Sequence, residues 1–314
     1  MSASSLLSTP KTMQPSQRQL GADGVLLIVA LIWGITFTMI KDALVHVSVF
    51  AFLGQRFTLA SALFVPFLVW RWRCFAWRAV AHGAILGIFL FGAFAFQTIG
   101  LAFTTASNTA FVTGMNVVFV PLINGLLFRV HIPVPVRSGV ILAALGLAGL
   151  TLNTGLEINP GDLVVLLCAV CIALQIIFTG RYAGRNDVYW LTAVQIAVVA
   201  VGSTAIGWIR GEEVFFWEPK IASALVLCAP LATVFAFWAQ TAMQRFTLPS
   251  RAALIFCMEP VFGALYACLV GGEHLGPWAG LGAAGIFLGM VCAEMPETWW
   301  VRLKAGWGSR EAGS

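Results

Sequence analysis

Two charged side chains, Arg56 and Glu259, stand within long apolar stretches of this sequence, and Pro260 follows the glutamate directly. A carboxylate in such surroundings can bind a cation, take up a proton or pair with an arginine. Pro260 has no backbone N–H and leaves the carbonyl of Phe256 without its helical partner. Together, Glu259 and Pro260 indicate a bent, polar point inside an otherwise apolar helix. What this point can do depends on what surrounds the helix.

The composition places most of the chain in lipid. Of its 314 residues, 60% are hydrophobic and 10% are charged, with a formal net charge of +5. A soluble domain has about 25% charged residues, so a water-soluble globule of this size could not bury so much apolar surface. Inside a bilayer, an isolated strand would leave its backbone polar groups unpaired, so each spanning segment should be a helix. The composition therefore predicts an all-α integral membrane protein.

Apolar runs long enough to cross a ~30 Å hydrocarbon core recur along the sequence. Ten transmembrane helices are predicted, near Val25–Ile40, Val47–Trp70, Ala79–Leu101, Ala106–Phe128, Val136–Asn153, Asp162–Gly180, Val188–Trp208, Ile221–Thr241, Leu248–Val270 and Pro277–Glu294. The polar residues 1–23 predict a disordered cytoplasmic tail, and residues 296–314 predict a second cytoplasmic tail.

Lysine and arginine divide unevenly between the two sides that ten spans define. Fourteen fall on the side of the N-terminus and three on the other side. Because cytoplasmic loops carry the excess of these residues, both termini are predicted to lie in the cytoplasm, in a multi-pass protein of the cell (inner) membrane. The same distribution explains the positive net charge without a nucleic-acid partner.

The sequence also repeats itself. Ala93–Gly146 aligns without a gap onto Ala236–Gly289 with 17 identical positions, and a weaker match pairs Arg56 with Gln195. The chain therefore divides into two five-helix repeats, residues 24–154 and 161–295. Because five is odd, the second repeat enters the membrane from the opposite side. Inverted repeats of this kind are the usual architecture of secondary transporters, whose solute site lies near the midplane between the halves.

Four stretches resemble EamA-like members of the drug/metabolite transporter superfamily. They are LIWGITFTMIK (31–41), FQTIGLAFTTASNTAFVTGMNVVFVPL (96–122), GDLVVLLCAVCIALQIIFTGRYA (161–183) and AQTAMQRFTLPSRAALIFCMEPVFGALYACLVGGEHL (239–275). The resemblance implies export of small organic solutes through a central cavity lined by spans 1, 3, 4, 6, 8 and 9, without nucleotide hydrolysis. The chain departs from the family pattern at Ile172 and Ala173, which stand where the first repeat has Trp33 and Gly34.

Depth in the membrane selects the candidate cavity residues. Glu259 lies about 16 Å from one end of its span and Arg56 about 14 Å from an end of its own, so both are near the midplane. An ionised group there costs roughly 2.5 kcal/mol or more and should face protein or a wet cavity. The two either meet the charged ends of a solute or form a buried pair that locks two helices. The full candidate set is Trp33, Thr36, Phe37, Arg56, Gln97, Asn116, Gln175, Trp238, Gln240 and Glu259, with kinks at Pro121, Pro230 and Pro260.

These features predict a secondary-active transporter that exports small metabolites such as amino acids by alternating access. A multidrug or organic-cation exporter is the alternative within transport, and a membrane sensor or scaffold is the alternative outside it. An intramembrane enzyme is disfavoured because the four histidines all fall near span ends. The expected partners are a small-molecule solute and the lipid bilayer, with no nucleic acid, cofactor or metal. Gly285 and Gly289 suit either close packing within the chain or a homodimer.

Overall fold

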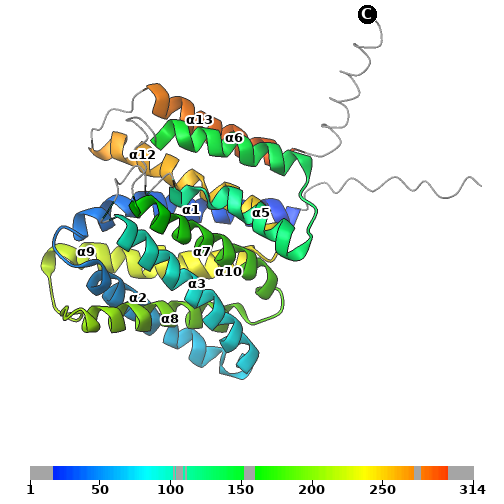
Figure 1. Cartoon of the computed structure of the whole chain (residues 1–314). Coiled ribbons are helices and arrows are strands. Elements are labelled where there is room, and N and C mark those ends of the chain that lie inside the picture. Colours follow the sequence, from blue (N-terminus) through cyan, green and yellow to red (C-terminus); the bar gives the residue numbers. More distant parts are fainter. Residues whose placement is uncertain are drawn as a thin grey trace, which may run out of the picture.

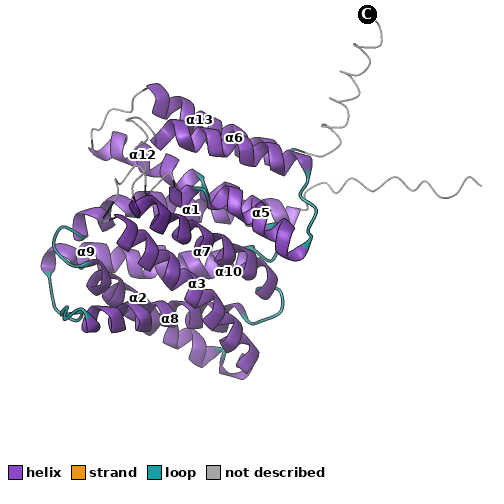
Figure 2. Ribbon diagram, viewed as in Figure 1, coloured by secondary structure: helices purple, strands orange, loops and turns teal. Residues whose placement is uncertain are grey.

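The computed structural model describes residues 17–101, 103, 109, 112–151, 160–271 and 277–295, and this part of the chain forms helices and no strand (Figure 2). The helices are α1 (Gln17–Ala43), α2 (Val49–Trp70), the short η1 (Trp72–Cys74), α3 (Trp77–Leu101), α5 (Asn116–Phe128), α6 (Val134–Thr151), α7 (Pro160–Tyr182), α8 (Val188–Ile209), α9 (Pro219–Leu227), η2 (Cys228–Phe235), α10 (Ala236–Met243), α11 (Pro249–Phe256), α12 (Met258–Gly271) and α13 (Pro277–Glu294).

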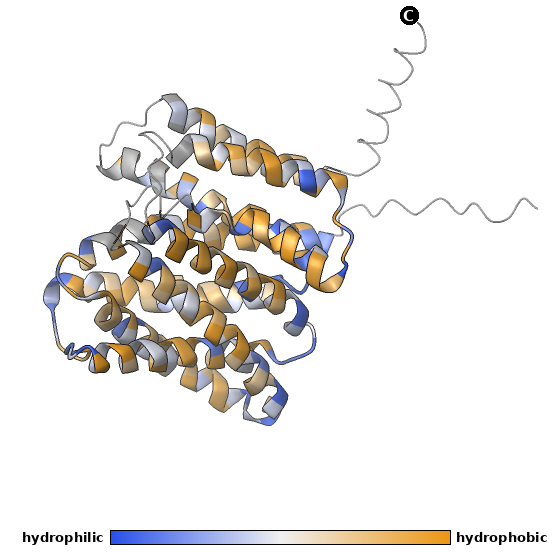
Figure 3. Cartoon of the chain, viewed as in Figure 1, coloured by the Kyte–Doolittle hydropathy of each residue, from blue (hydrophilic) through white to orange (hydrophobic). Residues whose placement is uncertain are grey.

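A multi-pass membrane architecture fits these helices. Six helical segments are long and apolar enough to cross a membrane, one of them built from α9, η2 and α10 in succession. Shorter apolar helices cover Val112–Phe128, Val134–Gly149 and Gly280–Ala293. Figure 3 shows hydrophobic residues along nearly all of these helices. The all-helical membrane fold is therefore confirmed, whereas the count of ten spans stays a prediction.

The first helix begins earlier than the sequence suggested. α1 starts at Gln17, so residues 17–23, which the sequence assigned to the tail, are helical in the structure. Ala22 and Asp23 are buried, which shows that the polar first turns of α1 pack against neighbouring helices. Hydropathy missed these turns because their residues are mostly polar. Residues 1–16 and the predicted tail 296–314 lie outside the described part of the chain.

Among the described residues, two large apolar cores meet at α1, which lies near the centre of the bundle (Figure 1), and two smaller apolar clusters lie apart from them. One core joins α1 with parts of α5, α6, α7 and α11, and the other joins α2, α3 and α8 with η2. Trp33 and Trp238 pack against both cores. These two tryptophans therefore stand where the two cores meet.

Glycines bring α6 and α13 into close contact at one edge of the bundle (Figure 1). A Cβ added to Gly146 would lie 2.6 Å from Gly282 O, and one added to Gly289 would lie 2.7 Å from Gly139 O. One added to Gly285 would lie 3.0 Å from Gly146 Cα. Gly285 and Gly289 thus pack within the chain, against α6. The homodimer stays a prediction, and this glycine pair does not support it.

We predict that Gly146→Leu forces α6 and α13 apart and destabilises the protein by about 1–3 kcal/mol, because the added side chain meets backbone atoms that cannot move aside. The melting temperature in detergent should fall by roughly 5 °C. Gly280→Leu on α13 is the matched control, since no atom lies within 4 Å of its added Cβ. Equal melting temperatures for the two variants would refute this packing.

Candidate functional site

One backbone carbonyl, that of Ala232 in η2, joins three helical segments. Trp33 Nε1 on α1 donates a hydrogen bond to it at 2.9 Å. Arg56 Nη2 on α2 donates to the same oxygen at 3.2 Å, and Arg56 Nε donates to Thr233 Oγ1 at 2.8 Å. Arg56 is only 3% exposed. A buried guanidinium is therefore held by polar groups of η2 at the junction of the two cores.

The geometry of η2 makes this arrangement possible. Cys228–Phe235 form a π-helix, a rare wide helix that often occurs at functional sites. Pro230, a predicted kink, lies inside it and cannot donate a backbone hydrogen bond. Thr233 Oγ1 donates to Cys228 O at 2.9 Å, so its oxygen is oriented to accept from Arg56. Irregular backbone at membrane depth is tolerated where it is buried in protein, as Ala232 and Thr233 of η2 are here.

Glu259 lies at a break between two half-helices. α11 ends at Phe256 and α12 begins at Met258, with Cys257 at the junction. Glu259 occupies the first turn of α12, where the helix dipole favours a negative charge. Pro260, another predicted kink, follows directly. The polar, bent point that the sequence indicated is therefore the start of a half-helix.

The first repeat breaks within one residue of the equivalent place. α5 begins at Asn116, the counterpart of Glu259, and the preceding Met115 has a ψ of −9°, close to the −12° of Cys257. Asn116 Nδ2 donates to Thr113 O at 2.9 Å. The first-repeat break has no proline at its start, and Pro121 lies further along α5. Two half-helix starts, one acidic and one amide, thus occur at equivalent positions.

Arg56 and Glu259 interact electrostatically but not as a contact pair. The two groups lie close enough for their opposite charges to attract one another. In the described part of the chain, no ion pair joins them. Arg56 is bound to η2, and Glu259 is half-buried at the start of α12. The buried, locking ion pair considered from the sequence is therefore not formed in this structure.

Three glutamines and a threonine form a chain of hydrogen bonds across the second repeat. Gln240 Nε2 donates to Gln175 Oε1 at 3.0 Å, and Gln175 Nε2 donates to Gln195 Oε1 at 3.2 Å. Gln195 Nε2 donates to Thr241 Oγ1 at 3.1 Å. All four side chains are buried. Two of the candidate cavity residues, Gln175 and Gln240, thus tie α7, α8 and α10 together.

The counterparts of these four residues in the first repeat are Thr36, Arg56, Gln97 and Thr98, and the first three of them bond elsewhere. Thr36 Oγ1 donates to Ile32 O at 2.7 Å, within its own helix. Gln97 Nε2 donates to Thr113 Oγ1 at 3.2 Å. Arg56 bonds to η2. Equivalent positions in the two repeats are therefore paired differently.

Three candidate cavity residues have a buried polar atom without a hydrogen-bond partner in the described part of the chain: Asn116 Oδ1, Trp238 Nε1 and Gln240 Oε1. Leaving a buried polar atom unpaired costs about 1–3 kcal/mol, so such atoms are places where a solute or water can bind. All three belong to the candidate cavity set. The side chain of Phe37, also in that set, lies outside the described residues.

Sequence reasoning missed part of this arrangement. Thr233 and the Ala232 carbonyl carry no motif, because their role depends on the π-helix. Gln195 and Thr241 had a detectable signal, since they align with Arg56 and Thr98 in the other repeat. A polar residue aligned with a candidate site residue was therefore the sign that could have identified them.

Known proteins resemble most of the chain. Residues 21–152 and 159–294 each match the model of the EamA-like transporter family. An uncharacterized transporter of Archaeoglobus fulgidus is 33% identical over 279 residues, which cover 88% of this chain and 87% of the relative. The uncharacterized transporter YyaM of Bacillus subtilis is 23% identical over 278 residues, 83% of this chain and 89% of the relative. A solved crystal structure, 18% identical, superposes with a TM-score of 0.75 over 87% of this chain and 96% of that chain, and shows the fold alone.

We predict that Thr233→Val destabilises the protein by about 1.5–3 kcal/mol, because the buried guanidinium of Arg56 loses an acceptor. Thr192→Val is the matched control: Thr192 is also fully buried, but its hydroxyl has no partner to lose. The melting temperature in detergent should fall for the first variant and stay unchanged or rise for the second. A similar small effect for both would mean that the Arg56 contact contributes little.

Proposed function

The chain belongs to the EamA-like transporter family, and from that premise we propose that it is a secondary-active transporter that exports small metabolites such as amino acids by alternating access. Membership of a transporter family also makes it a transporter rather than an enzyme. We propose the identity of the solute, the direction of transport and the transport mechanism. We also propose that the protein lies in the inner membrane with both termini in the cytoplasm, which the distribution of lysine and arginine supports.

The different pairing of equivalent residues supports alternating access. Inverted-repeat transporters expose the central site to each side in turn by moving one repeat against the other. If the repeats exchange conformations, contacts closed in one repeat open while the equivalent contacts in the other close. In the second repeat the hydrogen bonds of the glutamine chain are formed, and the equivalent side chains of the first repeat bond elsewhere. This asymmetry is what one state of such an exchange requires.

The same logic gives Arg56 a transport role. In the exchanged state, Arg56 takes in the first repeat the place that Gln195 has in the second, and pairs with Thr36 and Thr98, the counterparts of Gln175 and Thr241. To do so it leaves Thr233 and the Ala232 carbonyl. While Arg56 moves between these two sets of partners, its guanidinium can bind a solute carboxylate, since arginine is suited to bidentate carboxylate recognition. Trp33, bonded to the same carbonyl, follows the movement of η2.

Opposite charges near one another support an amino acid as the solute. Arg56 suits a carboxylate, and Glu259, at the start of a half-helix, suits an ammonium group or a proton. The unpartnered atoms of Asn116, Trp238 and Gln240 provide further polar contacts. A zwitterion satisfies both charges at once, which lowers the cost of each in the membrane.

An organic-cation exporter is the second candidate, and one observation favours it. Trp33 packs against Phe237 and Phe256, with ring centroids 5.4 and 5.3 Å away, near the half-helix that carries Glu259. Aromatic rings attract organic cations through their π-faces. Such an exporter would depend on Glu259 but not on Arg56, so the two candidates differ in which charge they need.

We predict that purified protein in liposomes transports at least one member of a labelled amino-acid pool. Both Glu259→Gln and Arg56→Met should slow transport about tenfold or more, since each removes a charged contact with the solute, equivalent to about 1.4 kcal/mol. Glu213→Gln, at an exposed glutamate, is the control and should leave the rate unchanged.

The outcomes separate the candidates. Loss of transport in Glu259→Gln alone, with an organic cation as the transported solute, would favour the cation exporter. Equal rates in the wild type and both variants would assign Arg56 and Glu259 a structural role. No transport of any amino acid by well-folded protein would reject the amino-acid proposal.

A further inference from the structure

The connection between α2 and α3 concentrates aromatic and basic residues. Residues 70–78 read WRWRCFAWR, with three tryptophans, three arginines and no acidic residue. Trp70, Trp72 and Trp77 are 69%, 63% and 77% exposed. Arg73 and Arg78 are exposed as well. The connection follows the end of one apolar helix and precedes another, so it lies at the edge of the membrane and on its predicted cytoplasmic side.

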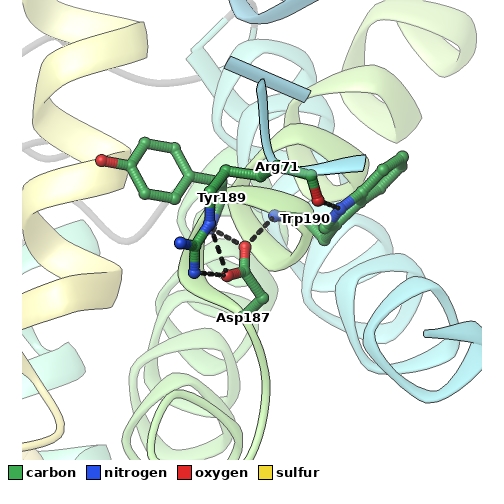
Figure 4. Close-up of polar contacts among 4 residues, drawn as sticks. All are labelled: Arg71, Asp187, Tyr189 and Trp190. Atoms are coloured by element: carbon green, nitrogen blue, oxygen red, sulfur yellow. Dashed lines mark hydrogen bonds and ion pairs between the residues drawn. The ribbon is translucent and has the colours of Figure 1, made fainter. Parts of the chain in front are cut away.

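A network from the start of α8 holds this connection in place (Figure 4). Arg71 Nη2 and Nε donate to Asp187 Oδ2 at 2.5 and 3.2 Å. The same carboxylate caps α8 by accepting from the backbone N–H groups of Tyr189 and Trp190 at 3.0 and 3.2 Å. Trp190 Nε1 donates to Arg71 O at 3.1 Å. Both the side chain and the backbone of Arg71 are therefore fixed.

Aromatic contacts complete the support. The ring of Phe75 lies edge-on between Trp77 and Trp190, with centroids 5.2 and 4.9 Å away. Trp70 packs edge-on against Tyr189 at 6.1 Å. Supported tryptophans that remain largely exposed at helix ends belong at the level of lipid headgroups, where their apolar rings and polar N–H groups are both accommodated.

The charges of this connection are unbalanced. Asp187 balances the charge of Arg71, and its hydrogen bond raises the pKa of Arg71. Arg73 and Arg78 remain, and no salt bridge is recorded for either in the described part of the chain. Arg73 lies over the ring of Trp72, 5.5 Å from its centroid. Exposed arginines beside interfacial tryptophans suit a lipid phosphate, because the guanidinium binds the phosphate and the ring contacts the acyl chains.

We propose that Trp70–Arg78 form a binding site for an anionic phospholipid of the cytoplasmic leaflet, with Arg73 and Arg78 on the headgroup and Trp72 and Trp77 on the glycerol and upper acyl region. Charge complementarity selects an anionic lipid over a zwitterionic one. The exposed tryptophan rings select a lipid over a free anion. The site is separate from the central site and does not depend on which solute is transported.

The test compares lipid retention by the full chain in nanodiscs of phosphatidylcholine with and without phosphatidylglycerol, measured by native mass spectrometry. The wild type should retain phosphatidylglycerol over phosphatidylcholine by about tenfold, and Arg73→Gln/Arg78→Gln should lose most of this preference. Arg137→Gln/Arg245→Gln removes two other exposed arginines from the same predicted side and should keep it. All four side chains are exposed, so folding should be unaffected, which melting temperatures check.

A second variant separates a lipid from a simple anion. Trp72→Ala/Trp77→Ala should weaken retention of phosphatidylglycerol while both arginines remain, and inorganic phosphate should not displace the lipid. Unchanged preference in the Arg73/Arg78 variant, or equal loss in the control, would overturn the site. Full retention in the tryptophan variant together with displacement by inorganic phosphate would overturn the lipid assignment and leave an anion site.

Discussion

A buried cation in an apolar helix bundle must be satisfied, and in this chain the Ala232 carbonyl and Thr233 satisfy Arg56. An unpaired guanidinium at membrane depth would be too costly to keep. The residues of η2 that present these acceptors, Ala232 and Thr233, are buried against the bundle. Arg56, Trp33 and η2 therefore depend on one another. The junction of the two apolar cores is built from polar contacts that hold only while these segments stay together.

The two repeats use related sequences to make different contacts. One continuous chain of hydrogen bonds joins Gln240, Gln175, Gln195 and Thr241. Their counterparts Thr36, Arg56 and Gln97 bond to other groups. Thr36 and Arg56 differ in side chain from their counterparts Gln175 and Gln195, but Gln97 and Gln240 are identical and still choose different partners. Under the proposed exchange, this pair differs because the two repeats have different conformations. Hydrogen bonds suit such an exchange, because each is worth only about 1 kcal/mol net and can be replaced by an equivalent one. Alternating access by exchange of the repeats depends on this equivalence.

Hydropathy alone predicted much of the fold, because membrane helices must be long and apolar. The last helix, Pro277–Glu294, has the bounds that the sequence indicated. The start of α1 was missed because its first turns are polar, although they are partly buried. The bend beside Glu259 was foreseen from Pro260, whereas the equivalent break at Met115 has no proline and shows only in the repeat alignment.

The candidate site was predicted less completely than the fold. The predicted depth in the membrane selected Arg56, Gln175 and Gln240, but it could not show which hydrogen-bond partner each side chain would choose. That choice depends on side-chain directions and on the carbonyls that η2 leaves accessible. The π-helix has no sequence signature beyond Pro230, and a proline is compatible with a simple kink. Pairing between helices is a tertiary property, so it required the structure.

The most direct test of the exchange between repeats is a pair of distances measured by spin labelling, in protein whose exposed Cys74 is replaced by serine. One label pair replaces Trp77 and Phe246. The other replaces Lys220 and Phe103, their counterparts in the opposite repeats. Exchange predicts two distances for each label pair, one for each state. Gln195→Leu breaks the glutamine chain, so it should increase the share of the longer distance in one pair and of the shorter distance in the other. A single distance in each pair, unchanged by Gln195→Leu, would contradict it.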